Sequence, residues 1–115
     1  MPHDIKVLLY DIHNAIADVE SYFDDRPKRF DVYVADSRTR RAVERNLEII
    51  GEATKRLLTL TPTITLSNAR SIVAMRNRIA HGYDTVSDEI IWSVVINHLP
   101  ELKREVGTLI RNLEL

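Results

Sequence analysis

The stretch SRTRRAVERNLEIIGEATKRLL, residues 37–58, decides the fold class. At about 100° per residue, one mainly apolar stripe runs along a helix formed by this stretch; it consists of Val43, Leu47, Ile50, Thr54 and Leu57. Further apolar residues widen the stripe on one side, namely Ala42, Ile49 and Ala53. Asp36 precedes the stretch and is a favourable N-cap. We therefore predict a long amphipathic helix over residues 37–58, with an apolar arc too wide for a single neighbour.

The rest of the chain has the same helical periodicity in pieces. We predict helices over residues 4–24, from Ser67 or Asn68 to His81 with Gly82 just beyond the end, and from Ser87 to about residue 99. Pro100 suits the first turn of a last helix. Residues 28–34 are expected to form a loop or short turn. The expected fold is all-α: an up-and-down four-helix bundle with an additional short C-terminal helix.

Length and composition restrict the class of protein. The 115 residues suit one domain spanning 1–115, and there is no cysteine for a disulfide or a thiolate metal site. The first ten residues lack the pattern of a signal peptide, and the near-apolar run 90–96 is too short to cross a membrane. We expect a cytoplasmic protein. Its net charge of −1 argues against DNA binding through bulk positive charge.

Arg76 does not fit the apolar face on which it falls. In the predicted helix ending at His81, it lies between Ile72 and Ile79. A buried guanidinium without a partner costs many kcal/mol, so Arg76 must pair with a carboxylate or face a cleft. Two explanations stay open. One is an ion pair with a glutamate of another helix, and the other is an arginine waiting for an anion such as phosphate.

His81 and Tyr83 stand close to Arg76 in the chain. A histidine at a helix C-terminus has a raised pKa, which suits it to general acid–base chemistry, although such a residue is more often a plain capping residue. Tyr83 follows across Gly82. Together the three residues could cleave a phosphodiester without a metal: His81 takes the proton of a ribose 2′-OH, Arg76 neutralises the phosphorane and Tyr83 donates a hydrogen bond. Attack by a 2′-OH would confine the substrate to RNA.

The segment MRNRIAHGYDTV, residues 75–86, resembles the signature of the HEPN superfamily. More narrowly, it is similar to the HepT toxins of prokaryotic HepT/MntA toxin–antitoxin pairs, whose motif is Arg, four residues, His, one residue, Tyr. Asn77 matches the polar residue favoured after the arginine. RAVERNLEIIGEA (41–53) and IIWSVVINHLPEL (90–102) resemble the second- and fourth-helix blocks of the same family. Asn46, inside the first of these blocks, is a candidate supporting polar residue.

The resemblance implies a metal-independent endoribonuclease that needs no cofactor. It implies a HEPN-like homodimer in which two Arg76–His81 sets face each other across a cleft at the interface. The implied partners are an RNA substrate and a small nucleotidyltransferase antitoxin of a type VII pair, which transfers AMP to the motif tyrosine, here Tyr83. Nucleotide attached beside the cleft would block RNA sterically and by like charge.

Other readings of the sequence stay open. The same resemblance allows a non-catalytic HEPN module that holds nucleotide or substrate for a nucleotidyltransferase, and a helical dimerisation adaptor is a third reading. Glu44, Glu48 and Glu52 recur on one helix face, but a solvated charged face explains them better than a metal site. The basic residues around position 26–45 indicate either an RNA or antitoxin surface or a solvated surface.

Overall fold

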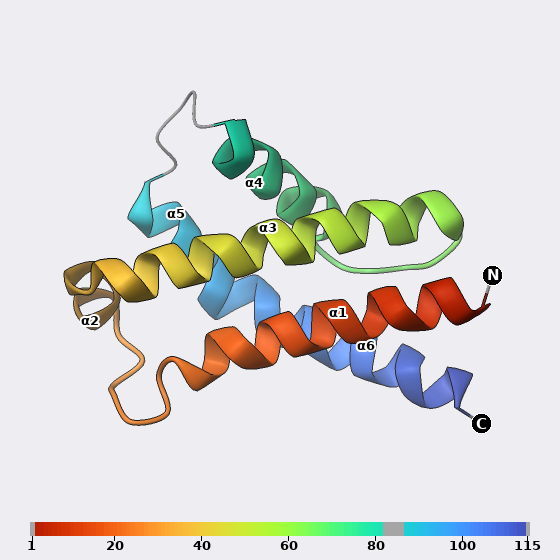
Figure 1. Cartoon of the computed structure of the whole chain (residues 1–115), viewed down its shortest axis with the longest axis horizontal. Coiled ribbons are helices and arrows are strands. Elements are labelled where there is room, and N and C mark those ends of the chain that lie inside the picture. Colours follow the sequence, from red (N-terminus) through yellow and green to blue (C-terminus); the bar gives the residue numbers. More distant parts are fainter. Residues whose placement is uncertain (1, 82–86, 115) are drawn as a thin grey trace.

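All regular secondary structure in the part of the chain that the structure describes is helical, which confirms the predicted all-α class. This computed structural model describes residues 2–81 and 87–114, and side chains for 4–80 and 87–114. Figure 1 shows the order of the elements, whose bounds are α1 Pro2–Ser21, α2 Phe30–Ala35, α3 Ser37–Leu60, α4 Ala69–His81, α5 Asp88–Ser93, the π-helix η1 Val94–His98 and α6 Leu99–Leu113.

Helix α3 is the centre of the molecule. It packs against α1 on one side and α4 on another, while α6 crosses behind α1 in the view of Figure 1. The stripe residues Val43, Leu47, Ile50 and Leu57 are all buried. Because two helices cover α3 from different directions, its apolar arc is wider than a single contact needs, as the sequence predicted.

Capping residues set the starts of α3 and α5. The Asp36 carboxylate accepts hydrogen bonds from the backbone N–H groups of Arg38 (3.0 Å) and Thr39 (3.4 Å), as predicted. Arg26 donates to the same carboxylate over 2.8 Å, which ties the turn after α1 to the start of α3. Ser87 caps α5 through the N–H of Ile90.

The expectation of a loop or short turn over residues 28–34 is wrong, because α2 covers Phe30–Ala35. Tyr33 is completely buried and its ring stacks on Trp92 with 5.1 Å between centroids. Phe30 packs beside Tyr33. The contact of Tyr33 with Trp92, with Phe30 packed beside it, stabilises this short helix. A contact between residues so far apart in the chain is not visible in the local periodicity of the sequence.

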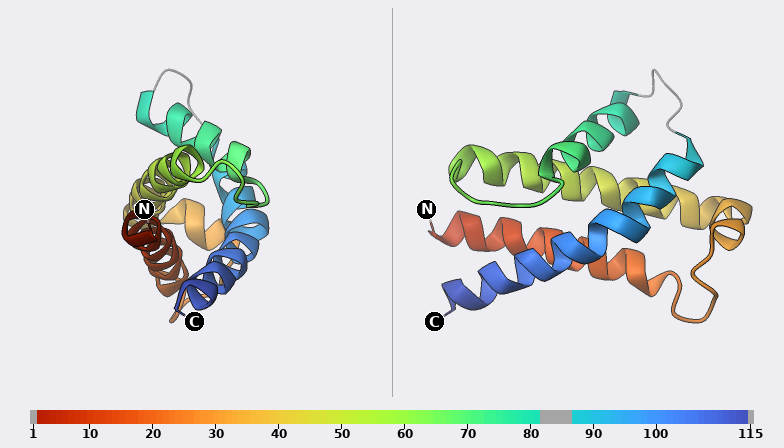
Figure 2. Two further views of the ribbon diagram at one scale, coloured as in Figure 1. Left: turned by 90° about the vertical axis from the view of Figure 1, so that its right-hand side faces the viewer. Right: turned by 180° about the vertical axis from the view of Figure 1, so that it is seen from behind.

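The predicted additional C-terminal helix is present as α6, with Pro100 in its first turn, but it is not short. Helix α6 spans 15 residues and continues α5 and η1 without a non-helical residue between them (Figure 2). Pro100 lies in the first turn of α6, where its ring would oppose an ordinary α-helical hydrogen bond. The preceding π-helix accommodates it, since the N–H of Leu99 bonds to the carbonyl of Val94, five residues back. The proline widens the helix instead of ending it.

Among residues 2–81 and 87–114, no helix is both long and apolar enough to cross a membrane.

Candidate functional site

Arg76 projects from α4 toward α3 at the contact between the two helices. Its Nη2 lies 3.1 Å from Oε2 of Glu52, which forms an ion pair between the helices. The arginine side chain keeps 28% of its surface exposed and the glutamate 47%. The first explanation for Arg76, a glutamate partner on another helix, therefore holds. The guanidinium is nevertheless not sealed in a core, because more than a quarter of the side chain still meets solvent.

Gly51 allows Arg76 to lie close to α3. A Cβ on Gly51 would collide with the Cβ of Arg76, and it would come within 2.8 Å of Arg76 Cγ and 3.2 Å of the carbonyl oxygen of Ile72. Only glycine leaves room for the α4 backbone at this depth. Sequence reasoning missed Gly51 as a site residue, although a glycine inside a strongly helical stretch is itself a signal of close approach.

Asn77 holds the guanidinium from a second direction. Its Oδ1 accepts a hydrogen bond of 3.0 Å from Nη1 of Arg76. An arginine has five N–H donors. One of them is hydrogen-bonded to Asn77, while Glu52 faces Nη2 as an ion pair, and the guanidinium makes no other hydrogen bond among the described residues. The unused donors are enough to bind a phosphate in the bidentate fashion that arginine favours.

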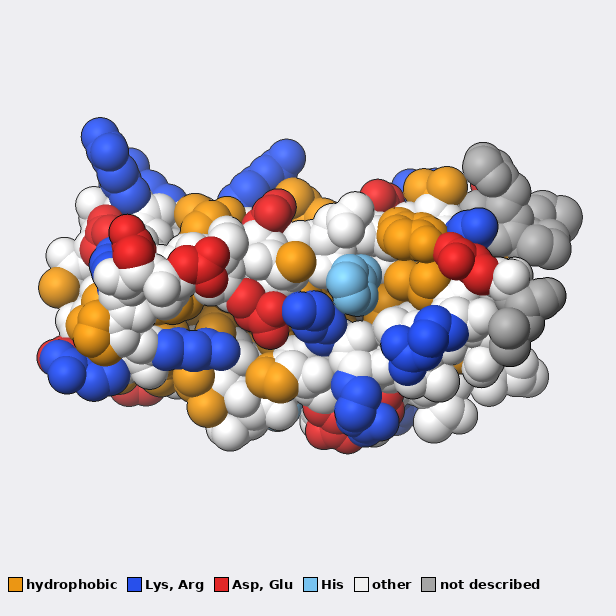
Figure 3. All heavy atoms as spheres, turned by 90° about the horizontal axis from the view of Figure 1, so that it is seen from below, with side chains coloured by type: hydrophobic (Ala, Val, Ile, Leu, Met, Phe, Trp, Pro, Cys, Tyr) orange, Lys and Arg blue, Asp and Glu red, His pale blue; other side chains and the backbone are white. Residues whose placement is uncertain are grey.

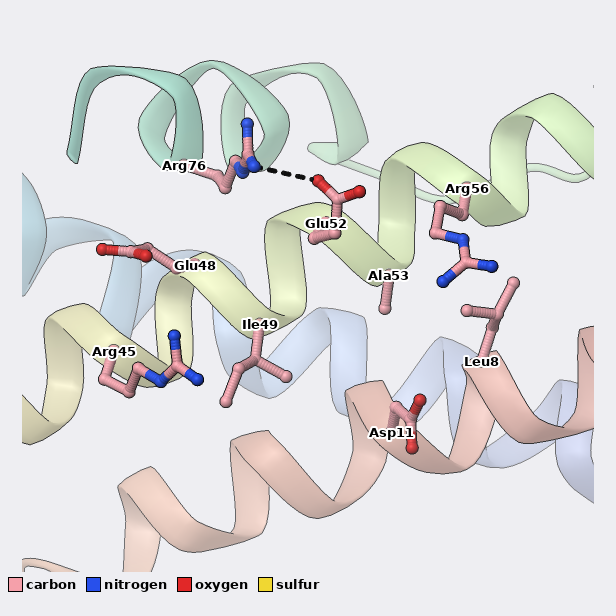
Figure 4. A pocket seen from close by; sticks show the side chains of 9 residues that line it. All are labelled: Leu8, Asp11, Arg45, Glu48, Ile49, Glu52, Ala53, Arg56 and Arg76. Carbon is pink, nitrogen blue, oxygen red and sulfur yellow. Dashed lines mark ion pairs between the residues drawn. The ribbon is translucent and has the colours of Figure 1, made fainter. Parts of the chain in front are cut away.

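A cavity of about 330 Å³ opens beside this cluster, between α1, α3 and α4. Figure 4 shows Arg76 at its upper edge, Glu52 below it, and Asp11 of α1 on the opposite side. The remaining wall comes from one face of α3 and from α1: Leu8, Arg45, Glu48, Ile49, Ala53 and Arg56. The cavity is an open groove with Arg76 accessible from it.

The charges of this cavity are balanced. Three arginines and three carboxylates line it, and the carboxylates are Asp11, Glu48 and Glu52. The same mixture extends over the face formed by α1 and α6, where acidic and basic side chains alternate without one continuous basic area (Figure 3). An anion would therefore be bound at this cavity by directed hydrogen bonds rather than by a strong surrounding positive field.

His81 is the last residue of α4, where the sequence predicts it. Its side chain lies outside the described residues, and so do Gly82 and Tyr83. Helix geometry still relates His81 to Arg76: in an α-helix, residues five apart are separated by about 7.5 Å along the axis and by roughly 140° around it.

Asn46 is not part of this cluster. Its side chain is buried, and its Nδ2 donates to the hydroxyl of Tyr22 (2.7 Å) and to the carbonyl oxygen of Ala42 (3.0 Å). It does not line the Arg76 cavity. These contacts fasten α3 to the end of α1, so a supporting role at the site remains a prediction that these hydrogen bonds do not favour.

Several other charged residues form ion pairs with one another away from this cavity. Arg26 pairs with Asp36, Arg29 with Asp31, and Arg40 with Asp88. Of the three spaced glutamates, Glu52 has the Arg76 contact, while burial and the nearby Asp88 raise the pKa of Glu44. Within residues 4–80 and 87–114, no group of three His, Cys, Asp or Glu side chains is arranged to hold a metal.

Comparisons with known proteins agree with the resemblance. The family profile described as "Ribonuclease HepT-like" matches residues 12–109. The chain is 32% identical over 115 residues to "Putative RNase MJ0127" of Methanocaldococcus jannaschii, and this alignment covers 96% of the chain and 91% of that protein. It is 35% identical over 107 residues to "Probable ribonuclease HepT" of Thermococcus cleftensis, covering 90% and 93%. No solved structure matches. The chain therefore belongs to the HepT-like family of ribonucleases.

Proposed function

We propose that this protein is a metal-independent endoribonuclease that cleaves RNA by attack of a ribose 2′-OH, within a single domain spanning residues 1–115. The observation that carries the proposal is Arg76: an arginine paired with Glu52 and hydrogen-bonded to Asn77, with further N–H donors unused among the described residues and an open cavity beside it. A purely structural ion pair has no need of that cavity or of the unused donors.

In this proposal Arg76 binds the scissile phosphate and stabilises the charge that develops on its oxygens. His81, five residues along α4, is the general base that removes the 2′-OH proton. The 2′-oxygen attacks phosphorus, the bond to the 5′-oxygen breaks, and that oxygen takes up a proton from solvent as it leaves. The products are a 2′,3′-cyclic phosphate and a 5′-OH. His81 is a reasonable base because a helix C-terminus favours its protonated form.

We further propose that the working unit is a homodimer. The family resemblance implies a dimer in which the Arg76–His81 sets of two copies face each other across a cleft. A second copy that faces the first would allow Arg76 and His81 to meet at a shared phosphate. Large apolar side chains that keep more than a third of their surface exposed are available for such an interface, including Ile49 beside the cavity and Ile90 and Ile96 on the α5–η1 segment.

The family resemblance supports a toxin role with Tyr83 as the regulatory residue. In this proposal a nucleotidyltransferase antitoxin transfers AMP from ATP to the Tyr83 hydroxyl and releases pyrophosphate. The added phosphate, close in sequence to Arg76 and His81, competes with RNA for the site and repels it. Mass spectrometry after incubation with such an enzyme and ATP should show AMP on the wild-type chain and none on Tyr83→Phe. AMP on another residue would contradict this part of the proposal.

A second candidate function is a non-catalytic module that binds nucleotide for a nucleotidyltransferase. The balanced charge of the cavity is the observation in its favour, because a small nucleotide needs fewer cationic contacts than an RNA strand. The two functions differ in outcome: a binding module would retain nucleotide and leave RNA intact.

The test is RNA cleavage in the presence of EDTA by wild type, Arg76→Ala and His81→Ala. Wild type should cleave, and each variant should lose at least about a hundredfold in rate, the usual effect of removing one such donor or base. Circular dichroism should show the same helix content in all three proteins. RNA left intact by well-folded wild type would refute the enzyme, and nucleotide binding by the same sample would then support the second candidate.

A further inference from the structure

Glu52 is an unexpected neighbour for an arginine that binds phosphate. Its Oε2 is 3.1 Å from Arg76 Nη2, and its side chain lines the same cavity. A carboxylate there opposes an incoming phosphate through like charge. If the pair served stability alone, its contribution would be small, since both side chains are partly exposed.

The geometry of the pair points to a different use. Glu52 forms an ion pair at Nη2 and Asn77 accepts a hydrogen bond from Nη1, so the guanidinium is contacted at both of its terminal nitrogens. Gly51, the residue before Glu52, fixes the stem of the arginine against α3. A long, flexible arginine side chain loses rotamer entropy on binding. Fixing it beforehand removes much of that cost from the transition state.

We infer that Glu52 is a positioning residue for RNA cleavage: it orients the Arg76 guanidinium toward the scissile phosphate, at the expense of weaker RNA binding. The inference rests on the proposed ribonuclease function. It assigns to Glu52 two opposite effects, because the same carboxylate favours the transition state through Arg76 and disfavours the bound substrate through its own charge. A residue with a merely structural role would not separate these two effects.

The experiment measures kcat and KM for RNA cleavage with Glu52→Ala and Glu52→Gln. Glu52→Ala should lower kcat about tenfold or more, because a loosely held catalytic group costs up to about a hundredfold. It should also lower KM, since a negative charge has left the cavity. Glu52→Gln keeps an acceptor oxygen, so it should recover most of kcat while KM stays low.

Glu48→Ala is the matched control. Glu48 stands one turn before Glu52 on α3 and lines the same cavity, but it has no hydrogen bond or ion pair to Arg76. Glu48→Ala should lower KM as Glu52→Ala does and should not reproduce the fall in kcat. In an Arg76→Ala background, Glu52→Ala should cause no further loss of kcat, since the group that it orients is gone.

The outcomes separate the inference from the function on which it rests. Wild type that leaves RNA intact would refute the ribonuclease proposal, and the inference with it. Wild type that cleaves, with equal kcat for Glu52→Ala and Glu48→Ala, would refute the inference alone. Further loss from Glu52→Ala in the Arg76→Ala background would also overturn it, since Glu52 would then act independently of the arginine. Thermal unfolding of each variant checks that every comparison uses folded protein.

Discussion

Gly51 on α3 lies directly against the side-chain stem of Arg76 on α4, so that a Cβ at position 51 would stand 2.8 Å from Arg76 Cγ. The contact joins the two helices at the point where the Arg76 side chain enters the cavity. The distance between α3 and α4 therefore also sets the position of the guanidinium. The absence of a side chain at Gly51 thus links the packing of the two helices to the proposed chemistry.

Gly51→Ala should both destabilise the protein and slow RNA cleavage. Alanine is favoured over glycine inside a helix by about 1 kcal/mol. Here that gain is outweighed by collision with Arg76 and the backbone of α4, because overpacking of this kind costs about 1–3 kcal/mol. We expect a net loss of up to roughly 2 kcal/mol in urea unfolding, together with a lower kcat because Arg76 is displaced.

Gly107→Ala provides the matched control. Gly107 lies within α6, and the nearest atom to a Cβ there is Nη1 of Arg111 at 3.6 Å, an ordinary contact with a flexible side chain. This variant should be neutral or gain up to about 1 kcal/mol in stability from helix propensity alone. Equal effects of Gly51→Ala and Gly107→Ala would show that the close approach at Gly51 has no energetic importance.

Arg76 and Gly51 show which site residues could be predicted from the sequence and which could not. Arg76 could be found because a charge on an apolar helix face is anomalous in any fold, and its neighbour on the chain, Asn77, matched a family pattern. Glu52 stood among other glutamates on a charged face, and nothing local distinguished it. Its role and that of Gly51 depend on which part of α3 meets α4, which is a tertiary relationship that periodicity does not contain.

Asn46→Ala should reduce stability without changing the cleavage rate per folded molecule. The substitution removes the hydrogen bonds from Asn46 to Tyr22 and Ala42, at a cost of about 1–2 kcal/mol for a buried group. Tyr22→Phe removes only one of the two acceptors and should cost less. Chemical denaturation and single-turnover cleavage measure the two effects separately. A fall in the cleavage rate of fully folded Asn46→Ala would restore Asn46 to the site as a supporting residue.

Asp36 should make stability depend on pH in the acid range. Hydrogen bonds from the Thr39 hydroxyl and backbone, with a further one from Arg26, lower the pKa of Asp36 below its ordinary value. The folded state thus holds the carboxyl proton less tightly than the unfolded state does. The stabilising contribution is complete above the unfolded pKa of about 3.9, and it disappears as pH falls through the lower folded pKa.

Asp36→Asn keeps a good N-cap but removes this charge. Its Tm should lie below that of wild type at pH 7, and the difference should shrink below about pH 4. Asp25→Asn, at an exposed carboxylate with no hydrogen bond among the described residues, should leave Tm at pH 7 close to that of wild type. A constant difference between Asp36→Asn and wild type down to the most acid pH would contradict the assignment.

The error at residues 28–34 has a tertiary origin. Residues 30–35 form a helix in which the Tyr33 ring stacks on Trp92, some sixty residues away, and local periodicity does not contain that contact. The last helix was predicted from Pro100, which lies in the first turn of α6, and only the direct continuation of α6 from the π-helix η1 was not predicted. The cap at Asp36 was predicted correctly because its hydrogen bonds are local.

The most direct test of the central claim, cleavage by 2′-OH attack at the Arg76 site, compares two substrates in EDTA. One is an RNA with a mapped cleavage site, and the other is the same RNA with a 2′-O-methyl group on the nucleotide 5′ to that site. Mass spectrometry identifies the product ends. We predict a 2′,3′-cyclic phosphate and a 5′-OH from the unmodified RNA, and no cleavage at the methylated position. Cleavage of the methylated substrate there, or products with a 3′-OH and a 5′-phosphate, would contradict the account.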